Sequence, residues 1–243
     1  VEMNHILRDP SFDDDIQVAI EYQIPQTSKR VDFIIAGQNG LQQESVVIVE
    51  LKQWQSATRT SRHGVVSAFT GGRLRAVAHP SYQAYSYAKT IENYNATVQD
   101  ENIRITPYAY LHNFLSGSYG ELASPLYTDI IELAPFYIKN ESDKLRDFIN
   151  KHVRYAPKRD LLYEIDNGRI RPSKALQDAL GSMLAGNEEF VMIDEQKVVY
   201  ETIRKLLEKS KKEGNKHTII VEGGPGTGKS VVAIQLLVEL VSK

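Results

Sequence analysis

Apolar and polar residues alternate near the start of the chain in a pattern that predicts strands. Apolar side chains occupy every second position across residues 16–24, which is typical of a half-buried strand. Residues 31–36 and 46–51 are mostly apolar runs rich in β-branched residues, and a Gly-Gln-Asn-Gly loop lies between them. Residues 65–78 predict a hairpin that turns at Gly71 and Gly72. The end of a helix, at residues 1–7, precedes these strands.

Helical periodicity dominates the second half of the chain. Residues 81–95 predict a helix, followed by strands at 103–111 and 130–133. Further helical patterns cover 141–153, 173–184 and 194–212. Residues 217–222 then predict a strand, 223–228 a glycine-rich loop and 229–241 a helix. This order predicts an α/β protein in three parts: a mixed α/β domain at 1–140, a helical linker region at 141–215, and the opening strand–loop–helix of a second domain at 216–243.

Composition narrows the class of protein without naming it. The 243 residues are 42% hydrophobic and 25% charged, as in ordinary globular proteins, and contain no cysteine. The lack of cysteine rules out disulfides, thiolate zinc sites and iron–sulfur clusters. We find neither a signal-peptide pattern nor an apolar run of about 20 residues, so we expect a cytoplasmic protein without membrane contact.

The distribution of charge is more informative than its total. The formal net charge is −2, yet no aspartate or glutamate occurs between Leu51 and Ile91. At the frequency of acids in the whole chain, a window of this length would hold about five of them. The window instead carries six basic residues, which predict a surface that attracts phosphates: Lys52, Arg59, Arg62, Arg73, Arg75 and Lys89.

A set of polar residues at the strand ends predicts a metal site. Glu50 and Lys52 end the third predicted strand, and residues two apart on a strand project from the same face, roughly 6–7 Å from each other. A hairpin would bring Asp32, in the preceding strand, beside Glu50. Two carboxylates with the Leu51 carbonyl between them form an oxygen-rich site that suits Mg²⁺ or Mn²⁺. Lys52 could orient a bound water or neutralise charge on a phosphate.

The helix predicted at 81–95 adds two more polar residues. Gln83 and Tyr87 are four residues apart and therefore share one helical face. The ordered set of D, then E-x-K, then Q-x-x-x-Y resembles the RecB-like branch of the PD-(D/E)xK nuclease superfamily over residues 16–111. The resemblance implies a restriction-endonuclease-like mixed sheet flanked by helices. It also implies that Asp32, Glu50 and the Leu51 carbonyl bind the metal, that Lys52 is catalytic, and that Gln83 and Tyr87 position the substrate or Lys52.

One departure from this family pattern concerns a further acidic residue. Many members carry it on the first core helix, and we expect this sequence to begin within that helix. Glu2 and Glu21 are the two candidates for the role, Glu21 because it could lie across from Asp32. The short E-x-K motif is not specific by itself, since Glu195-Gln196-Lys197 also fits it. That second copy opens a helix and lacks a preceding aspartate strand.

A second motif predicts nucleotide binding. Residues 223–230 read Gly-Gly-Pro-Gly-Thr-Gly-Lys-Ser, which satisfies the P-loop pattern between a predicted strand and a predicted helix. Backbone amides freed by Gly223, Gly226 and Gly228 could converge on the phosphates of ATP. Lys229 would reach the β- and γ-phosphates, and the Ser230 hydroxyl would bind Mg²⁺.

The region around the P-loop suggests the kind of protein to which it belongs. Asp194-Glu195-Gln196 resembles the adenine-reading glutamine region of superfamily 1 helicases. Together with the nuclease motifs, this is similar to bacterial nuclease–helicase fusions, including ones implicated in phage defence. Only 13 residues follow Ser230, too few for an acidic Walker-B strand or an arginine finger. We therefore expect a piece of a longer nuclease–NTPase, without ATP hydrolysis of its own, whose last helix packs on the nuclease domain, on the 173–212 helices or on a neighbouring chain.

The leading hypothesis is a metal-dependent nuclease that hydrolyses phosphodiester bonds of DNA, or of RNA, and is coupled in the full protein to ATP-driven translocation. One alternative is a nuclease fold that has lost cleavage and only binds nucleic acid for the motor. The other alternative is a regulatory NTPase whose N-terminal domain contacts proteins. The sequence does not distinguish endonuclease from exonuclease action and gives no oligomeric state.

Overall fold

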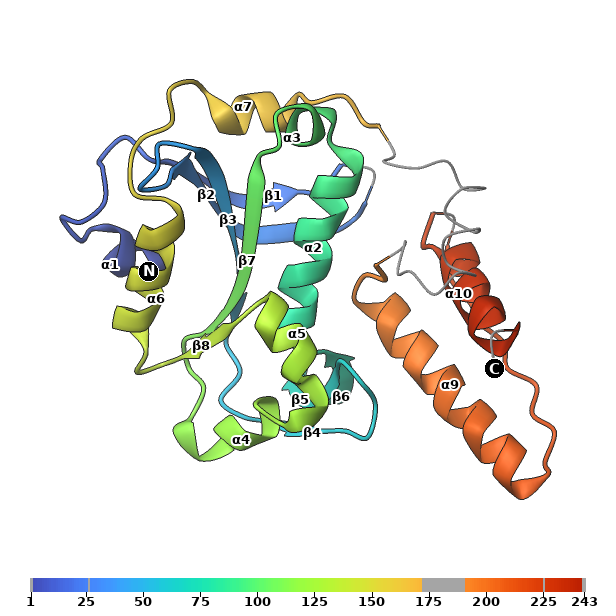
Figure 1. Ribbon diagram of the computed structural model, residues 1–243. Coiled ribbons are helices and arrows are strands. Elements are labelled where there is room, and N and C mark those ends of the chain that lie inside the picture. Colours follow the sequence, from blue (N-terminus) through green and yellow to red (C-terminus); the bar gives the residue numbers. More distant parts are fainter. Residues whose placement is uncertain (1, 26, 172–190, 225, 242–243) are drawn as a thin grey trace.

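A mixed five-stranded sheet forms the centre of the first domain (Figure 1). The computed structural model describes residues 2–25, 27–171, 191–224 and 226–241. The strand order is β1-β2-β3-β7-β8. The strands are β1 (Gln17–Gln23), β2 (Arg30–Gln38), β3 (Glu44–Lys52), β7 (Arg104–Leu111) and β8 (Phe136–Ile138). β1, β2 and β3 pair antiparallel, whereas β3, β7 and β8 pair parallel. The α/β fold class predicted from the sequence is therefore confirmed.

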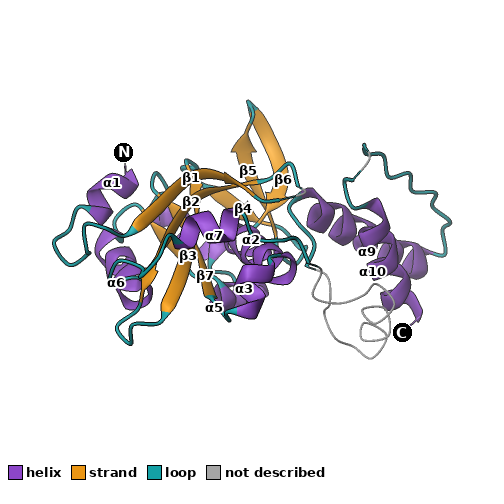
Figure 2. Ribbon diagram, turned by 90° about the horizontal axis from the view of Figure 1, so that it is seen from above, coloured by secondary structure: helices purple, strands orange, loops and turns teal. Residues whose placement is uncertain are grey.

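Helices cover both faces of this sheet, because successive residues of the central strands alternate between two apolar cores. Val46 and Ile48 of β3 point into a core shared with α2 (Pro80–Tyr94). Val47 and Val49 point into the opposite core, which α1 (Glu2–Leu7) and α6 (Ser142–His152) cover. Seen from above, the sheet lies between α1 and α6 on one side and α2 on the other (Figure 2). Burial on both faces explains why β2 and β3 read as continuous apolar runs.

The parallel pairing of β3 with β7 requires a long crossover, and this crossover carries a second sheet. Strands β4 (Ala57–Arg59), β5 (Val65–Thr70) and β6 (Arg73–Ala78) form it in antiparallel order. The predicted hairpin is confirmed, and both glycines of its turn adopt positive φ angles, 58° at Gly71 and 77° at Gly72. α2 follows directly, and its N-cap is His79, whose side chain accepts a hydrogen bond from the Ser81 amide.

Shorter elements complete the first domain. The remaining helices there are α3 (Ala96–Asp100), α4 (Tyr119–Leu122), α5 (Thr128–Leu133) and α7 (Leu161–Asp166), with single 3₁₀ turns at Ser116–Ser118 and Pro125–Tyr127. The strand predicted at 130–133 is wrong, because that segment belongs to α5. Its apolar run is only a few residues long, and such runs do not distinguish helix from strand by periodicity. The strand lies just beyond it, as β8.

Two helices follow the first domain along the chain. α9 (Glu195–Glu213) and α10 (Lys229–Val241) pack against each other, and α9 also contacts β5 and β6 (Figure 1). The predicted packing of the last helix on the 173–212 region is thus confirmed through α9. The helix predicted at 173–184 lies outside the described residues. None of the described helices combines the length and the apolar composition that crossing a membrane requires.

The strand predicted at 217–222 does not form. These residues are exposed and have no regular secondary structure, and Ile220 is 79% exposed. A strand of this kind depends on hydrogen bonds to neighbouring strands, and no described residue pairs with this segment. The apolar sequence of the segment is compatible with a strand, but its partners decide whether the strand exists.

Candidate functional site

Register in the central sheet brings Asp32 and Glu50 together. Phe33 pairs with Val49 and Ile34 with Ile48 in the β2–β3 ladder, so the next position along places Asp32 opposite Glu50. Glu50 continues the row of Val46 and Ile48 on the face that α2 covers, and Asp32 borders a cavity together with Phe33 and Leu51. The hairpin argument from the sequence is confirmed at this point.

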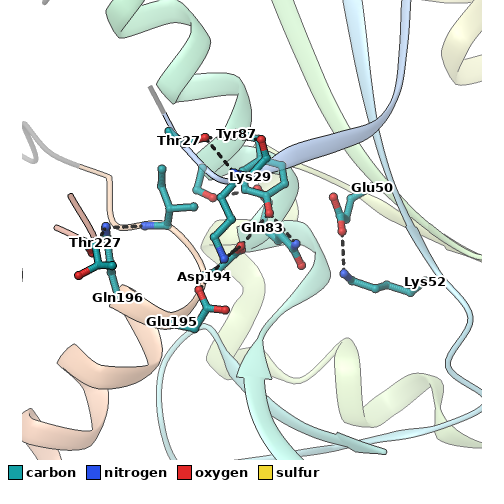
Figure 3. Close-up of polar contacts among 12 residues, drawn as sticks. Thr27, Lys29, Glu50, Lys52, Gln83, Tyr87, Asp194, Glu195, Gln196 and Thr227 are labelled. Carbon is teal, nitrogen blue, oxygen red and sulfur yellow. Dashed lines mark hydrogen bonds and ion pairs between the residues drawn. The ribbon is translucent and has the colours of Figure 1, made fainter. Parts of the chain in front are cut away.

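The residues at the end of β3 form a compact polar group around these two acids. The Leu51 amide donates a 2.7 Å hydrogen bond to Asp32 Oδ2. Lys52 Nζ lies 2.6 Å from Glu50 Oε1, as drawn in Figure 3. The same ammonium lies 5.5 Å from the centre of the Trp54 ring. The side chains of Asp32, Glu50 and Lys52, predicted to meet, therefore do so, and Leu51 is joined to them through its backbone.

Burial makes this group electrostatically unusual. Glu50 is only 3% exposed, and burial, opposed by Lys52 and reinforced by Asp32, raises the pKa of its carboxyl to about 8. Burial also raises the pKa of Asp32, although the hydrogen bond from Leu51 and the charge of Lys52 act against that change. Burial is the largest cause of both shifts and disfavours the charged form of each carboxyl.

The donor set fits a hard divalent cation. Glu50 Oε2 is buried and has no hydrogen-bond partner in the described part of the chain. An oxygen of this kind next to a second carboxyl is the ligand type that Mg²⁺ and Mn²⁺ prefer, and Mg²⁺ is commonly held by one or two carboxylates plus waters and substrate phosphates. Among the described residues, no group of three or more His, Cys, Asp and Glu side chains is arranged to hold a metal. A cation at this place would take its carboxylate ligands from Asp32 and Glu50.

A cavity of about 950 Å³ adjoins Asp32 and Leu51, and both candidates for the further acidic residue line it. Glu21 lies across the β1–β2 ladder from Asp32, between the pairs Ile20–Phe33 and Tyr22–Val31. Its φ angle of 55° is in the left-handed region, which residues other than glycine rarely adopt. Glu2 borders the same cavity from α1. Both candidates therefore lie at the wall of this cavity.

Gln83 and Tyr87 on α2 contact each other, as their spacing predicts. Gln83 Nε2 donates to the Tyr87 hydroxyl at 2.9 Å, and this hydroxyl donates to Asp194 Oδ2 at 2.7 Å. Burial, together with the charges of Asp194 and Glu50, raises the pKa of Tyr87 above its usual range, so the hydroxyl stays protonated. The Tyr87 hydroxyl is directed to Asp194, and the expectation that the pair positions the substrate or Lys52 stays a prediction.

Lys29 is a member of this network that sequence reasoning missed. Its Nζ lies 3.0 Å from Asp194 Oδ2 and 2.6 Å from Glu195 Oε2. Burial opposes the charge, but the ion pairs with Glu195 and Asp194 outweigh it and raise the pKa of Lys29. The only signal in the sequence was a turn between two strands, which gives no reason to connect Lys29 with residues more than 160 positions away.

The glycine-rich loop forms the second candidate site. Lys229 Nζ donates to the carbonyls of Gly223 and Gly224, at 2.7 Å each, and Ser230 follows in the first turn of α10. Gly226 and Gly228 have φ angles of 74° and 78°, which favour glycine. The loop curls around the lysine ammonium, a geometry in which incoming phosphate oxygens could replace the two carbonyls.

Gln196 joins this loop to the start of α9. Its side-chain nitrogen donates to the Thr227 carbonyl at 3.1 Å, and its oxygen accepts from the Ile193 amide at 3.0 Å. A Cβ atom on Gly228 would collide with the Gln196 amide, so this glycine also makes room for the contact. Gln196, which belongs to the segment that resembles the adenine-reading region of helicases, therefore lies beside the loop. The residues present thus fit a nucleotide.

The basic window is only partly available to an external phosphate. Three of its members are engaged within the protein: Lys52 with Glu50, Lys89 with Glu92, and Arg62 with Thr202. Arg59, Arg73 and Arg75 are exposed on the small sheet. The candidate phosphate surface is therefore narrower than the sequence window and centres on β4 and the β5–β6 hairpin.

Comparison with known proteins gives information about the glycine-rich region alone. Residues 216–243 match a family described as Schlafen group 3, DNA/RNA helicase domain. No curated protein and no solved structure matches the chain. The match indicates a helicase-like region around the loop and α10. The match does not reach the sheet domain, whose site is described only by the arrangement of Asp32, Glu50 and Lys52 and of the α2 pair, Gln83 and Tyr87.

Proposed function

We propose that this chain is a Mg²⁺- or Mn²⁺-dependent nuclease that hydrolyses phosphodiester bonds of DNA, or of RNA. The observation that carries the proposal is the pair of adjacent carboxyls, Asp32 and Glu50, with a buried Glu50 oxygen that lacks a partner and Lys52 at 2.6 Å. The order of these residues also resembles that of the RecB-like nucleases. Among soluble folds, this combination has its best explanation in metal-assisted phosphate chemistry.

The residues of the chain have separable roles in this proposal. Asp32, Glu50 and the Leu51 carbonyl would hold the cation, which polarises the phosphodiester and lowers the pKa of a bound water. Lys52 carries a positive charge at the same place and would stabilise negative charge on the phosphate in the transition state. Gln83 and Tyr87 would fix the wall of the site that α2 forms. The exposed arginines would hold the nucleic-acid backbone.

The glycine-rich loop extends the proposal to ATP. Gly223, Gly226, Gly228, Lys229 and Ser230 would bind its phosphates, and the helicase-domain match over 216–243 supports coupling to an ATP-driven helicase or translocase in the full-length protein. Nucleic acid is then the partner of both regions. We place this activity in the cytoplasm, and the resemblance to nuclease–helicase fusions supports a part in defence against phage.

A cleavage assay tests the proposal directly. Labelled single- and double-stranded DNA and RNA are incubated with the chain in Mg²⁺, in Mn²⁺ and in chelator. We expect metal-dependent cleavage that Lys52→Ala reduces by about a hundredfold or more, since charge stabilisation of this kind is worth several kcal/mol. Lys89→Ala is the matched control, because it removes one lysine of the same basic window that pairs with Glu92 away from the acids. Full activity in folded Lys52→Ala would exclude Lys52 as a catalytic residue.

The binding-module alternative has one observation in its favour. The described residues supply two acids rather than a larger ligand cluster, and a fold that has lost a ligand can still bind nucleic acid. This alternative predicts binding of DNA, without cleavage, at every metal concentration. The same panel, run with a gel-shift measurement beside it, distinguishes the two functions.

A further inference from the structure

Asp194 has a backbone conformation that its position at a helix start does not require. It is the N-cap residue of α9, with φ 43° and ψ −107°, and its side chain makes no capping hydrogen bond. Aspartate usually caps a helix through its side chain, and positive φ is unfavourable for a residue with a Cβ atom. The carboxylate is turned away from its own helix, towards α2.

This carboxylate joins the two candidate sites. Oδ2 accepts the Tyr87 hydroxyl and lies 3.0 Å from Lys29, as Figure 3 shows, while Oδ1 is buried and has no hydrogen-bond partner among the described residues. Tyr87 in turn accepts from Gln83. The Asp194 carboxylate is therefore held by contacts with the sheet domain, whereas its backbone carbonyl accepts the Val198 amide of α9.

The other end of the link reaches the glycine-rich loop. A cavity of about 380 Å³ is lined by loop residues and by Gln196, and the β1–β2 turn forms another wall of it through Thr27, Ser28 and Lys29. The first domain therefore contributes directly to the cavity in which a nucleotide would lie. Lys29 forms ion pairs with Asp194 and Glu195 and, as part of the cavity wall, would also face a phosphate that enters.

We propose that Lys29, Asp194 and Tyr87 couple nucleotide binding at the glycine-rich loop to the nuclease centre, with Asp194 as the positioning residue. The inference rests on the proposed function. A polyphosphate in the cavity competes for Lys29 and so weakens the Lys29–Asp194 ion pair. Asp194 accepts the hydrogen bond of the Tyr87 hydroxyl, so a change at Asp194 also changes how Tyr87 is held beside Glu50. Coupling of this kind is reciprocal, so a change at Tyr87 must also change the affinity for nucleotide.

Reciprocity provides a test that does not depend on cleavage. Tyr87 does not line the nucleotide cavity, and Tyr87→Phe removes only its hydroxyl. Asp194 Oδ2 then has Lys29 as its remaining partner, holds it more firmly and leaves it less available to phosphate. Titration calorimetry with ADP is expected to show affinity weakened by about fivefold or more, the lower end of typical coupling between sites. Tyr108→Phe is the matched control, since its buried hydroxyl lacks a described partner and lies on the opposite face of the sheet.

A second variant identifies the route of the coupling. Lys29→Met is expected to weaken ADP binding by itself, and adding Tyr87→Phe to it should then have no further effect. Unchanged ADP affinity in Tyr87→Phe, or full additivity in the double variant, would overturn the coupling. Failure of the wild-type chain to bind ADP would overturn both the coupling and the nucleotide site. The nuclease proposal would be refuted separately: the chain would not cleave nucleic acid, although its ADP affinity still responds to Tyr87→Phe.

Discussion

Replacing Glu50 by glutamine is expected to stabilise the metal-free protein at neutral pH. The carboxyl is 3% exposed, one of its oxygens has no partner in the described chain, and burial raises its pKa to about 8. A buried carboxylate without full compensation destabilises the folded state. Glutamine keeps the shape and an acceptor for Lys52 but has no proton to lose, so it removes this penalty.

The magnitude follows from the two pKa values. The folded-state pKa of about 8 is above the usual 4.5, so the folded protein retains a proton that the unfolded chain releases. The stability that this proton provides is fully present below pH 4.5 and is lost as the pH rises to about 8. At about 1.4 kcal/mol for each pH unit, the loss by pH 7 is roughly 3 kcal/mol. Glu50→Gln has no carboxyl at this position, so its free energy of unfolding does not fall in this way.

Urea unfolding in chelator at pH 4.5 and at pH 8 measures the effect. The free energy of unfolding of Glu50→Gln should equal that of the wild type at pH 4.5 and exceed it at pH 8. Glu201→Gln is the matched control. This glutamate is also buried and paired with a lysine, but Lys197 is itself buried whereas Lys52 is partly exposed, so neutralising Glu201 leaves a buried ammonium uncompensated and should destabilise the fold. Mn²⁺ should stabilise the wild type and not Glu50→Gln. No gain at pH 8 would refute the buried-carboxylate argument.

Two further predictions concern the metal and the nucleic acid. Asp32→Asn removes one anionic ligand and should weaken Mn²⁺ binding by about tenfold or more in calorimetric titration, whereas equal affinity would exclude Asp32 as a ligand. Replacing Arg73 and Arg75 together should weaken DNA binding for all sequences and reduce the slope of log K against log salt by up to about two. An unchanged slope would mean that these arginines do not contact phosphates.

Much of the first domain could be predicted because its signals are local. Alternation and β-branched runs fixed the positions of β1, β2 and β3 to within two residues, and a short antiparallel connection left little choice of register between β2 and β3. That register brings Asp32 to Glu50, and the helical spacing of four brings Gln83 to Tyr87. Each of these contacts needs only the geometry of one element or of two neighbours in sequence.

The errors arose where a partner far away in the chain decides the structure. Residues 217–222 have the composition of a strand, but a strand exists only when another strand accepts its hydrogen bonds. In the described structure their apolar side chains remain exposed, and so do Leu237 and Leu240 of α10. A distant residue also limits the basic window. Arg62 donates a hydrogen bond to Thr202 on α9, 140 positions away, so it is not available to an external phosphate as the sequence window predicts.

Asp194 shows why the chemistry of the site is harder to predict than its fold. From the sequence it is an acid before a helix, close to a glutamine that resembles a helicase motif, and its position directly before α9 is confirmed. Its partner Tyr87 lies 107 positions earlier, and the family resemblance relates Tyr87 to the substrate or Lys52 without any link to Asp194. The local sequence pattern determines on which face of a helix or strand a side chain lies. The packing of the domains determines which residues that side chain contacts. A motif residue directed across that boundary, with a strained backbone and an unpartnered oxygen, is therefore the place where the two halves of this protein would affect each other.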